Sequence, residues 1–155
     1  MADVVGLVLD DHARVRGLFK ELQAAEGDPV RLAALWAELS ALLLAHCGAV
    51  EEVFSVPLLG AAPDRSLVMR DLRDQMSETR DTLAEARLRT PGSPQWWLAV
   101  RAVHAVVDRH VSSMEAGPLP RFRQRTPRRI RQELGRQWNR FMADLSEDNL
   151  EEGTS

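Results

Sequence analysis

Several features are scarce or missing in this sequence, and each absence narrows the class of protein. Cys47 is the only cysteine, so an intramolecular disulfide is excluded and a reducing cytoplasm fits best. No segment approaches the run of about 18 apolar residues that a membrane helix needs. The N-terminal stretch MADVVGLVLDDH has neither a basic start nor a cleavage site. We therefore expect a cytoplasmic protein with no membrane span and no export signal.

An excess of positive charge is also missing, since 20 lysines and arginines stand against 23 aspartates and glutamates and the formal net charge is -3. This balance argues against nucleic acid as the main partner. One basic segment stands out, RFRQRTPRRIRQELGR at 121–136, and an acidic end follows it. Runs of this kind usually form the solvated face of a helix, which is how we interpret this one.

No alternating strand pattern is present, and every long segment has apolar residues at helical spacing. Turn signals containing proline or glycine separate these segments. Asp28 and Ser93, each followed by proline, have the composition of N-caps with proline at the first helical position. The pattern predicts helices at 4–25, 29–56, 64–89, 94–116 and 127–146.

Short connections make sequential helices antiparallel neighbours. We therefore predict an all-α protein, an up-down-up-down antiparallel four-helix bundle with an additional C-terminal helix. Residues 1–146 form a single domain in this interpretation, and residues 147–155 form an acidic, disordered tail.

Three histidines fall inside the apolar seams of the predicted helices. His12, His46 and His110 lie at similar heights when residues are counted from the connecting loops, and Met76 occupies this level on the remaining helix. His104 lies one residue off its seam and is given no role. Buried imidazoles without partners would each cost on the order of 1–3 kcal/mol. A metal ion or a polar ligand could satisfy all three together.

Three segments carry a resemblance to a known family: DDHARVRGLFKEL, LLLAHCGAVEEVF and DRHVSSMEAGPLPRF. In this order they resemble the hemerythrin-like family, the HHE cation-binding domain, and TPRRIRQELGRQW is similar to the region after its bundle. The resemblance implies a four-helix bundle that holds two non-haem irons and handles dioxygen, nitric oxide or iron. It matches His12, His46 and His110 to three of the family's histidine ligands.

The family's other ligand positions are changed in this chain. The position of its helix-three histidine falls on Met76, or on Gln75 if the register shifts by one residue, and its two bridging carboxylates fall on Val50 and Met114. Glu51 and Glu115 each follow a histidine by five residues, so they should point away from the pocket. Two irons in a dry core need anionic ligands. A standard di-iron centre is therefore not expected.

A π-bulge would alter this conclusion for one carboxylate. The interval from His46 to Pro57 is one residue longer than the family's usual spacing, and Gly48 lies within it. A bulge near Gly48 would turn Glu51 inward and make it a less favoured metal ligand, with Glu115 as the equivalent on the other helix.

The leading hypothesis is a divergent metalloprotein with an apolar, histidine-lined pocket. A single metal ion, iron by the family resemblance, would bind His12, His46 and His110, and the pocket would be lined by Val50, Met76 and Met114. Haem is the other candidate cofactor, with His46 or His110 as axial ligand and Met76 as a second ligand. Either form would serve redox, dioxygen or nitric oxide chemistry.

Two hypotheses from other classes stay open. A bundle without any cofactor could act as an interaction or regulatory domain, with the 121–136 surface as its contact. An enzyme could instead bind a small organic substrate in the bundle core, with one histidine as acid or base. No motif selects a reaction, and the sequence does not define an oligomeric state.

Overall fold

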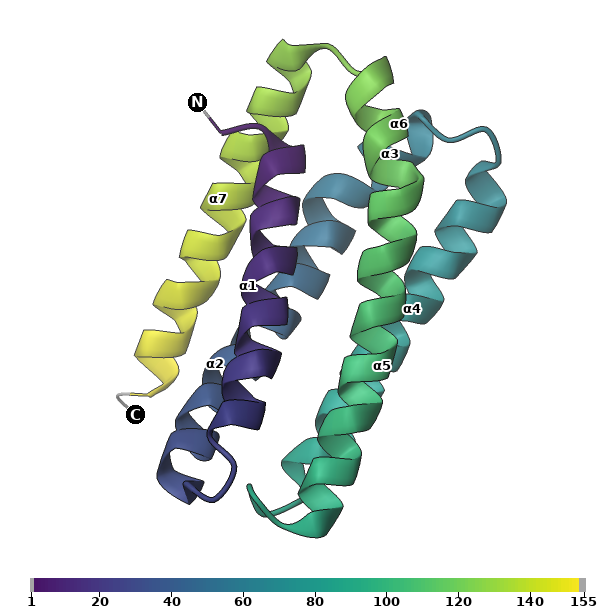
Figure 1. The fold of residues 1–155 in the computed structure, drawn as a ribbon. Coiled ribbons are helices and arrows are strands. Elements are labelled where there is room, and N and C mark those ends of the chain that lie inside the picture. Colours follow the sequence, from purple (N-terminus) through teal and green to yellow (C-terminus); the bar gives the residue numbers. More distant parts are fainter. Residues whose placement is uncertain (1, 154–155) are drawn as a thin grey trace.

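The computed structural model describes residues 2–153, which are almost entirely helical (Figure 1). Four long helices and one C-terminal helix correspond to the five that the sequence predicts. Two short helices and a π-helical turn complete the chain. In order, the elements are α1 (Val4–Ala24), α2 (Pro29–Ala49), η1 (Val50–Phe54), α3 (Ser55–Gly60), α4 (Arg65–Arg87), α5 (Pro94–Ala116), α6 (Pro118–Arg125) and α7 (Arg128–Glu152).

The bundle consists of two helical hairpins, α1 with α2 and α4 with α5, which face each other (Figure 1). Their apolar faces form two clusters of buried side chains, one near each end of the bundle. The first includes Leu18, Leu39 and Trp96, and the second includes Val8 and Phe54. The all-α bundle with an added C-terminal helix, predicted from the apolar periodicity, is confirmed.

Two helix starts have the caps that the sequence predicts. The side chain of Asp28 accepts a hydrogen bond from the backbone N–H of Arg31 at 3.1 Å, and Pro29 opens α2. Ser93 caps α5 in the same way, since its Oγ accepts from the backbone N–H of Trp96 at 3.1 Å. Each cap satisfies an amide that has no partner within its helix.

The second helix of the bundle is longer than predicted because α2, η1 and α3 are continuous. Its π-helical turn is closed by a bond from the amide of Ser55 to the carbonyl of Val50, five residues back. Pro57 follows within the next turn rather than ending the helix. The region Pro29–Gly60 has a mean hydropathy of 1.5 in its most apolar window, enough to cross a membrane by length and composition alone. Half of that window is buried inside the bundle, and core helices of soluble proteins pass the same test.

Helix α7 lies along α1 and α2, outside the four-helix core (Figure 1). Its closest approach is at Gly135, where a Cβ atom would lie 2.3 Å from the carbonyl oxygen of Ala2. Arg131 fixes the start of α7, because its Nε lies 2.6 Å from Oδ2 of Asp3, the N-cap of α1. The helix extends to Glu152, past the predicted end at 146 and into the segment for which we expected disorder.

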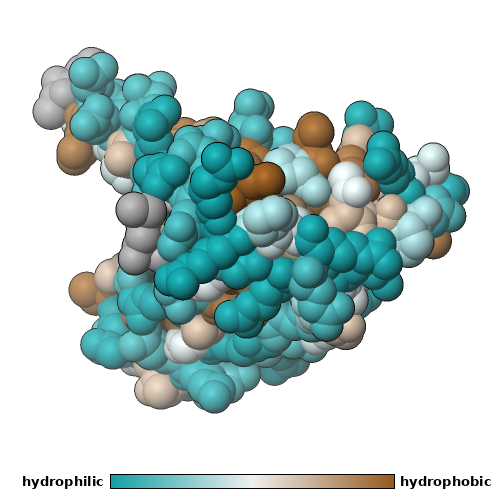
Figure 2. Space-filling view, turned by 90° about the horizontal axis from the view of Figure 1, so that it is seen from above, coloured by the Kyte–Doolittle hydropathy of each residue, from teal (hydrophilic) through white to brown (hydrophobic). Residues whose placement is uncertain are grey.

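The surface is mostly hydrophilic, as Figure 2 shows for the face seen from above. Hydrophobic side chains appear there as separate spots rather than as one broad patch. The basic segment 121–136 contributes to structure as well as to the surface. Arg131 donates to the carbonyls of Arg123 and Thr126 at 2.8 Å, and so holds the junction between α6 and α7.

Candidate metal site

The three seam histidines meet at one level of the bundle, between the two apolar clusters. His12 comes from α1, His46 from α2 and His110 from α5, and their side chains are almost fully buried. Their ring centroids are separated by 5.2, 5.7 and 5.8 Å. One nitrogen from each ring lies within 4.8 Å of those of the other two. The structure thus brings together the three residues that the sequence singles out.

Each ring is held from outside by a polar side chain of a neighbouring helix. Nδ1 of His46 lies 2.9 Å from Oδ2 of Asp11 on α1, and Nδ1 of His110 lies 2.8 Å from Oε1 of Gln75 on α4. Nδ1 of His12 lies 3.1 Å from Oε1 of Glu115 on α5. All three partner atoms are oxygens that accept a hydrogen bond, so each Nδ1 carries the proton. In the neutral ring, Nε2 is then an unprotonated acceptor.

The three Nε2 atoms are the nitrogens that the rings turn inward. All three are buried and have no hydrogen-bond partner in the part of the chain that the structure describes. They border a cavity of about 10 Å³, which matches the volume that a single water or ion requires. Its remaining lining is apolar or weakly polar: Val15, Leu43, Cys47, Met76, Thr79, Val107 and Val111. The hydroxyl of Thr79 already donates to the carbonyl of Gln75 at 2.8 Å. Within residues 2–153, no donor lies within hydrogen-bond distance of the three acceptors.

Of the three residues predicted to line the pocket, Met76 does so. Val50 and Met114 are also buried, with 0% and 2% of their surface exposed. They belong to the apolar cluster next to the histidines, which also includes Met76, rather than to the cavity wall. The carboxylates of the family pattern are thus replaced by side chains that close the core on that side.

Neither of the two less favoured carboxylate ligands enters the cavity. A π-helical turn is present close to Gly48, yet it begins only at Val50, so Glu51 keeps its α-helical direction relative to His46. The Glu51 side chain is 41% exposed and binds Arg80 at 2.5 and 2.9 Å. The π-helical turn therefore forms, but Glu51 does not turn inward and is not placed as a metal ligand.

Glu115 also stays outside the cavity, as its position five residues after His110 predicts. It does not point simply to solvent, because its Oε1 contacts Nδ1 of His12 and its Oε2 lies 2.8 Å from Nη2 of Arg16. The hydrogen bond from Arg16, followed by that from His12, lowers the pKa of Glu115. Its role is to orient a histidine and to supply negative charge nearby.

Burial holds two of the histidines in their neutral form. Desolvation, reinforced by the nearby His46, lowers the pKa of His12 to about 4. Desolvation likewise lowers the pKa of His110 to about 3. Burial also raises the pKa of the Cys47 thiol to about 11. At neutral pH His12 and His110 are therefore ready to donate a lone pair without losing a proton.

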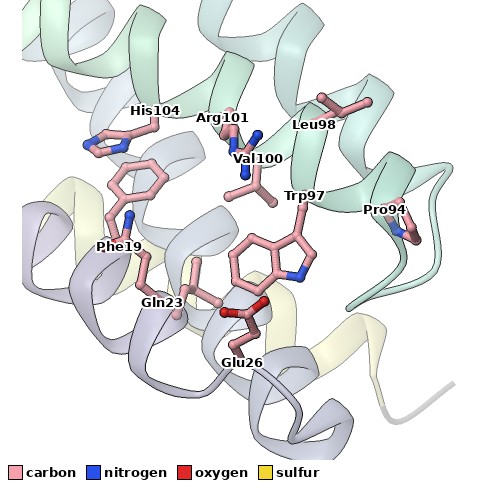
Figure 3. A pocket seen from close by; sticks show the side chains of 10 residues that line it. Phe19, Gln23, Glu26, Pro94, Trp97, Leu98, Val100, Arg101 and His104 are labelled. Atoms are coloured by element: carbon pink, nitrogen blue, oxygen red, sulfur yellow. The ribbon is translucent and has the colours of Figure 1, made fainter.

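The fourth histidine lies apart from this cluster. The ring of His104 stacks on Phe19 with centroids 4.2 Å apart and an interplanar angle of 17°. Both border a shallow, open hollow between α1 and α5 of about 650 Å³, together with Trp97 and Arg101 (Figure 3). His104 comes six positions before His110, about 9 Å along the helix axis. It therefore serves as a natural control for the three clustered histidines.

Sequence reasoning missed the outer roles of Asp11 and Gln75, of which Gln75 was considered only as an alternative position of the family's helix-three histidine. It also missed a covering residue, Trp138. The ring of Trp138 packs edge-on against His46 with centroids 5.5 Å apart. A signal for the first two was present, since Asp11 immediately precedes His12 and Gln75 immediately precedes Met76. Positions that flank an inward residue face the neighbouring helix, as in a coiled coil. Trp138 lies on α7. The apolar periodicity does not specify where that helix packs on the bundle, so the contact with His46 could not be predicted.

No curated protein and no solved structure gave a match. The family model of the hemerythrin HHE cation-binding domain matches residues 3–122, which contain all three clustered histidines and their outer partners. Helix α7 with Trp138 lies outside the matched region. A match over most of the chain, on this fold, shows that the protein belongs to the hemerythrin HHE cation-binding family.

Proposed function

We propose that this protein binds one metal ion through Nε2 of His12, His46 and His110. The observation that carries the proposal is the convergence of three buried acceptor nitrogens with no donor among residues 2–153 to serve them. Leaving them unpaired costs on the order of 1–3 kcal/mol each. A cation is the one kind of ligand that satisfies three lone pairs at once.

The spacing of the nitrogens supports a single ion. One nitrogen of each ring lies within 4.8 Å of the other two, and three such atoms have a common point within about 2.8 Å of each, from 4.8 Å divided by √3. Metal–imidazole bonds measure about 2.0–2.1 Å, so each ring would move inward by less than about 1 Å. The outer hydrogen bonds to Asp11, Gln75 and Glu115 keep each Nε2 directed at that point.

The donor set does not fit two irons. No carboxylate lines the cavity, and about 10 Å³ leaves no room for a second ion with a bridging ligand. The same volume argues against haem, whose macrocycle would require the helices to separate. It also leaves no space for a diatomic ligand beside a bound ion. Holding or releasing the ion itself, or passing electrons through it, is thus better supported than carrying dioxygen or nitric oxide.

Metal content after defined loading tests the proposal. Chelator-treated protein would be equilibrated with Zn(II), Fe(II) without oxygen, or Cu(I), then separated from free metal and analysed by mass spectrometry. We expect one ion per chain for at least one metal. His12→Gln, His46→Gln and His110→Gln should each lower this occupancy, while His104→Gln, which changes an imidazole outside the cluster, should not. Equal binding by all four variants would refute the site, and so would no binding of any metal by the wild type.

A further inference from the structure

We propose that the ion held by this site is monovalent copper, with the thioether of Met76 as a fourth donor. This inference rests on the proposed function and names the metal that the same site would select. It departs from the iron expected by resemblance because the residues around the cavity differ from those that iron prefers.

The first argument is the softness of the donors. Imidazole accepts several metals, but thioether and thiol sulfur favour Cu(I) over harder ions, whereas carboxylate and water favour harder ones. The cavity wall contains two sulfur side chains, Met76 and Cys47, and no carboxylate. Met76 lies on α4, the one helix of the four that supplies no histidine. A thioether needs no deprotonation, so it is available as a donor at any pH.

The second argument is charge. No carboxylate among the described residues lines the cavity, and the negative charge nearby is on Asp11 and Glu115, which contact His46 and His12 from outside. Glu115 is already paired with Arg16 through both of its oxygens, at 2.8 and 3.2 Å. Asp11 pairs with His46 and, among residues 2–153, with no arginine or lysine, so it is the carboxylate whose charge is left to balance an ion. A single positive charge matches this balance better than two, and burying it in an apolar core costs less.

The third argument is the lack of space for water. A divalent iron ion reaches its usual coordination number by adding water or other oxygen ligands, which a cavity of about 10 Å³ cannot hold beside the ion. Cu(I) has a filled d shell and accepts three or four ligands without such additions. Three imidazoles and one thioether complete its coordination.

A Met76→Leu variant tests the sulfur donor, and Met69→Leu, two turns earlier on α4, is its matched control. Leucine nearly conserves the volume of methionine, so both variants should fold. Chelator-treated proteins would be titrated with Cu(I) under nitrogen in competition with a colorimetric Cu(I) chelator, and with Zn(II) against a zinc indicator. We expect Met76→Leu to weaken Cu(I) binding by about tenfold or more and Zn(II) binding by far less, with Met69→Leu close to wild type. X-ray absorption at the copper edge should show nitrogen and one sulfur neighbour in the wild type, and nitrogen alone in Met76→Leu.

Arg16→Gln tests the charge argument independently. Removing the guanidinium frees the charge of Glu115, so binding of Zn(II) should strengthen more than binding of Cu(I). Arg14→Gln, an exposed arginine on the same helix, is the control. Cu(I) affinity that is unchanged in Met76→Leu, together with no sulfur neighbour, would overturn the copper assignment while leaving a three-histidine site for another ion. Failure of every metal to bind would instead overturn the proposed function itself.

Discussion

Asp11 and His46 form a contact between neighbouring helices, with Oδ2 of Asp11 2.9 Å from Nδ1 of His46. The residue that immediately precedes one clustered histidine thus orients another. The outer partners of His12 and His110 also lie on other helices, α5 and α4, although neither partner immediately precedes a clustered histidine. The contacts thus run in series from α2 through α1 and α5 to α4, so each ring is oriented by a side chain of another helix. Site geometry and bundle packing are consequently coupled.

Asp11→Asn should weaken metal binding without removing it. Asparagine can still accept a hydrogen bond from Nδ1 of His46, but it loses the negative charge that makes the imidazole a stronger ligand. Changes to such outer partners cost about 10–100-fold in metal affinity, and we expect the lower end of this range. The measurement is the competition titration of the metal that the wild type binds. Asp10→Asn, an exposed neighbour, should match wild type, and equal affinities for the two variants would contradict a role for Asp11.

Apolar periodicity predicts the helices and the level at which the histidines meet, because both follow from the 3.6-residue repeat. It cannot predict where the π-helical turn begins. The family spacing around Gly48 indicates an extra residue, but a shift of two positions decides whether Glu51 turns inward, and the turn begins at Val50. The contact of Glu115 with His12 is missed for a related reason. Seam analysis orients a residue relative to its own helix, whereas this carboxylate serves a ring on the adjacent one.

His110→Leu should stabilise the metal-free protein while abolishing metal binding. Leucine removes a buried acceptor that has no partner, and it can fill part of the small cavity. The expected gain in unfolding free energy is about 1 kcal/mol, at the low end of the cost of an unpaired buried group, because Gln75 loses its partner. Urea unfolding with a strong chelator present measures this. A loss of stability equal to that of a typical core mutation would show that Nε2 of His110 is satisfied in the metal-free state.

The stability of the metal-free protein should decline as the pH falls below about 6.5. His12 has a pKa of about 4 in the folded protein against 6.5 as a model value, so the unfolded chain takes up the proton first. Each neutral histidine makes its full contribution to stability above pH 6.5, the pKa of the unfolded chain. This contribution is lost progressively as the pH falls to about 4 for His12 and to about 3 for His110. Urea unfolding at a series of pH values measures the slope. It should be shallower in His12→Leu, and an unchanged slope in that variant would contradict burial of the neutral ring.

Gly135→Ala should destabilise the protein by separating α7 from the start of α1. A Cβ atom at this position would lie 2.3 Å from the carbonyl oxygen of Ala2 and 3.3 Å from the amide nitrogen of Val4, and backbone atoms cannot yield as a flexible side chain can. The expected cost is on the order of 1–3 kcal/mol, typical of overpacking. Gly17→Ala, in α1 with nothing within 4 Å of its added carbon, should instead gain about 0.5–1 kcal/mol from helix propensity.

The same variant asks whether α7 matters for the metal site. Trp138 follows Gly135 by less than one turn and covers the ring of His46, so displacing α7 should expose that ring to water. We therefore expect faster loss of bound metal to a chelator from Gly135→Ala than from Gly17→Ala, even at a temperature where both remain folded. Equal release rates would indicate that the four-helix core encloses the ion without α7, since the three histidines and their outer partners all lie within α1, α2, α4 and α5.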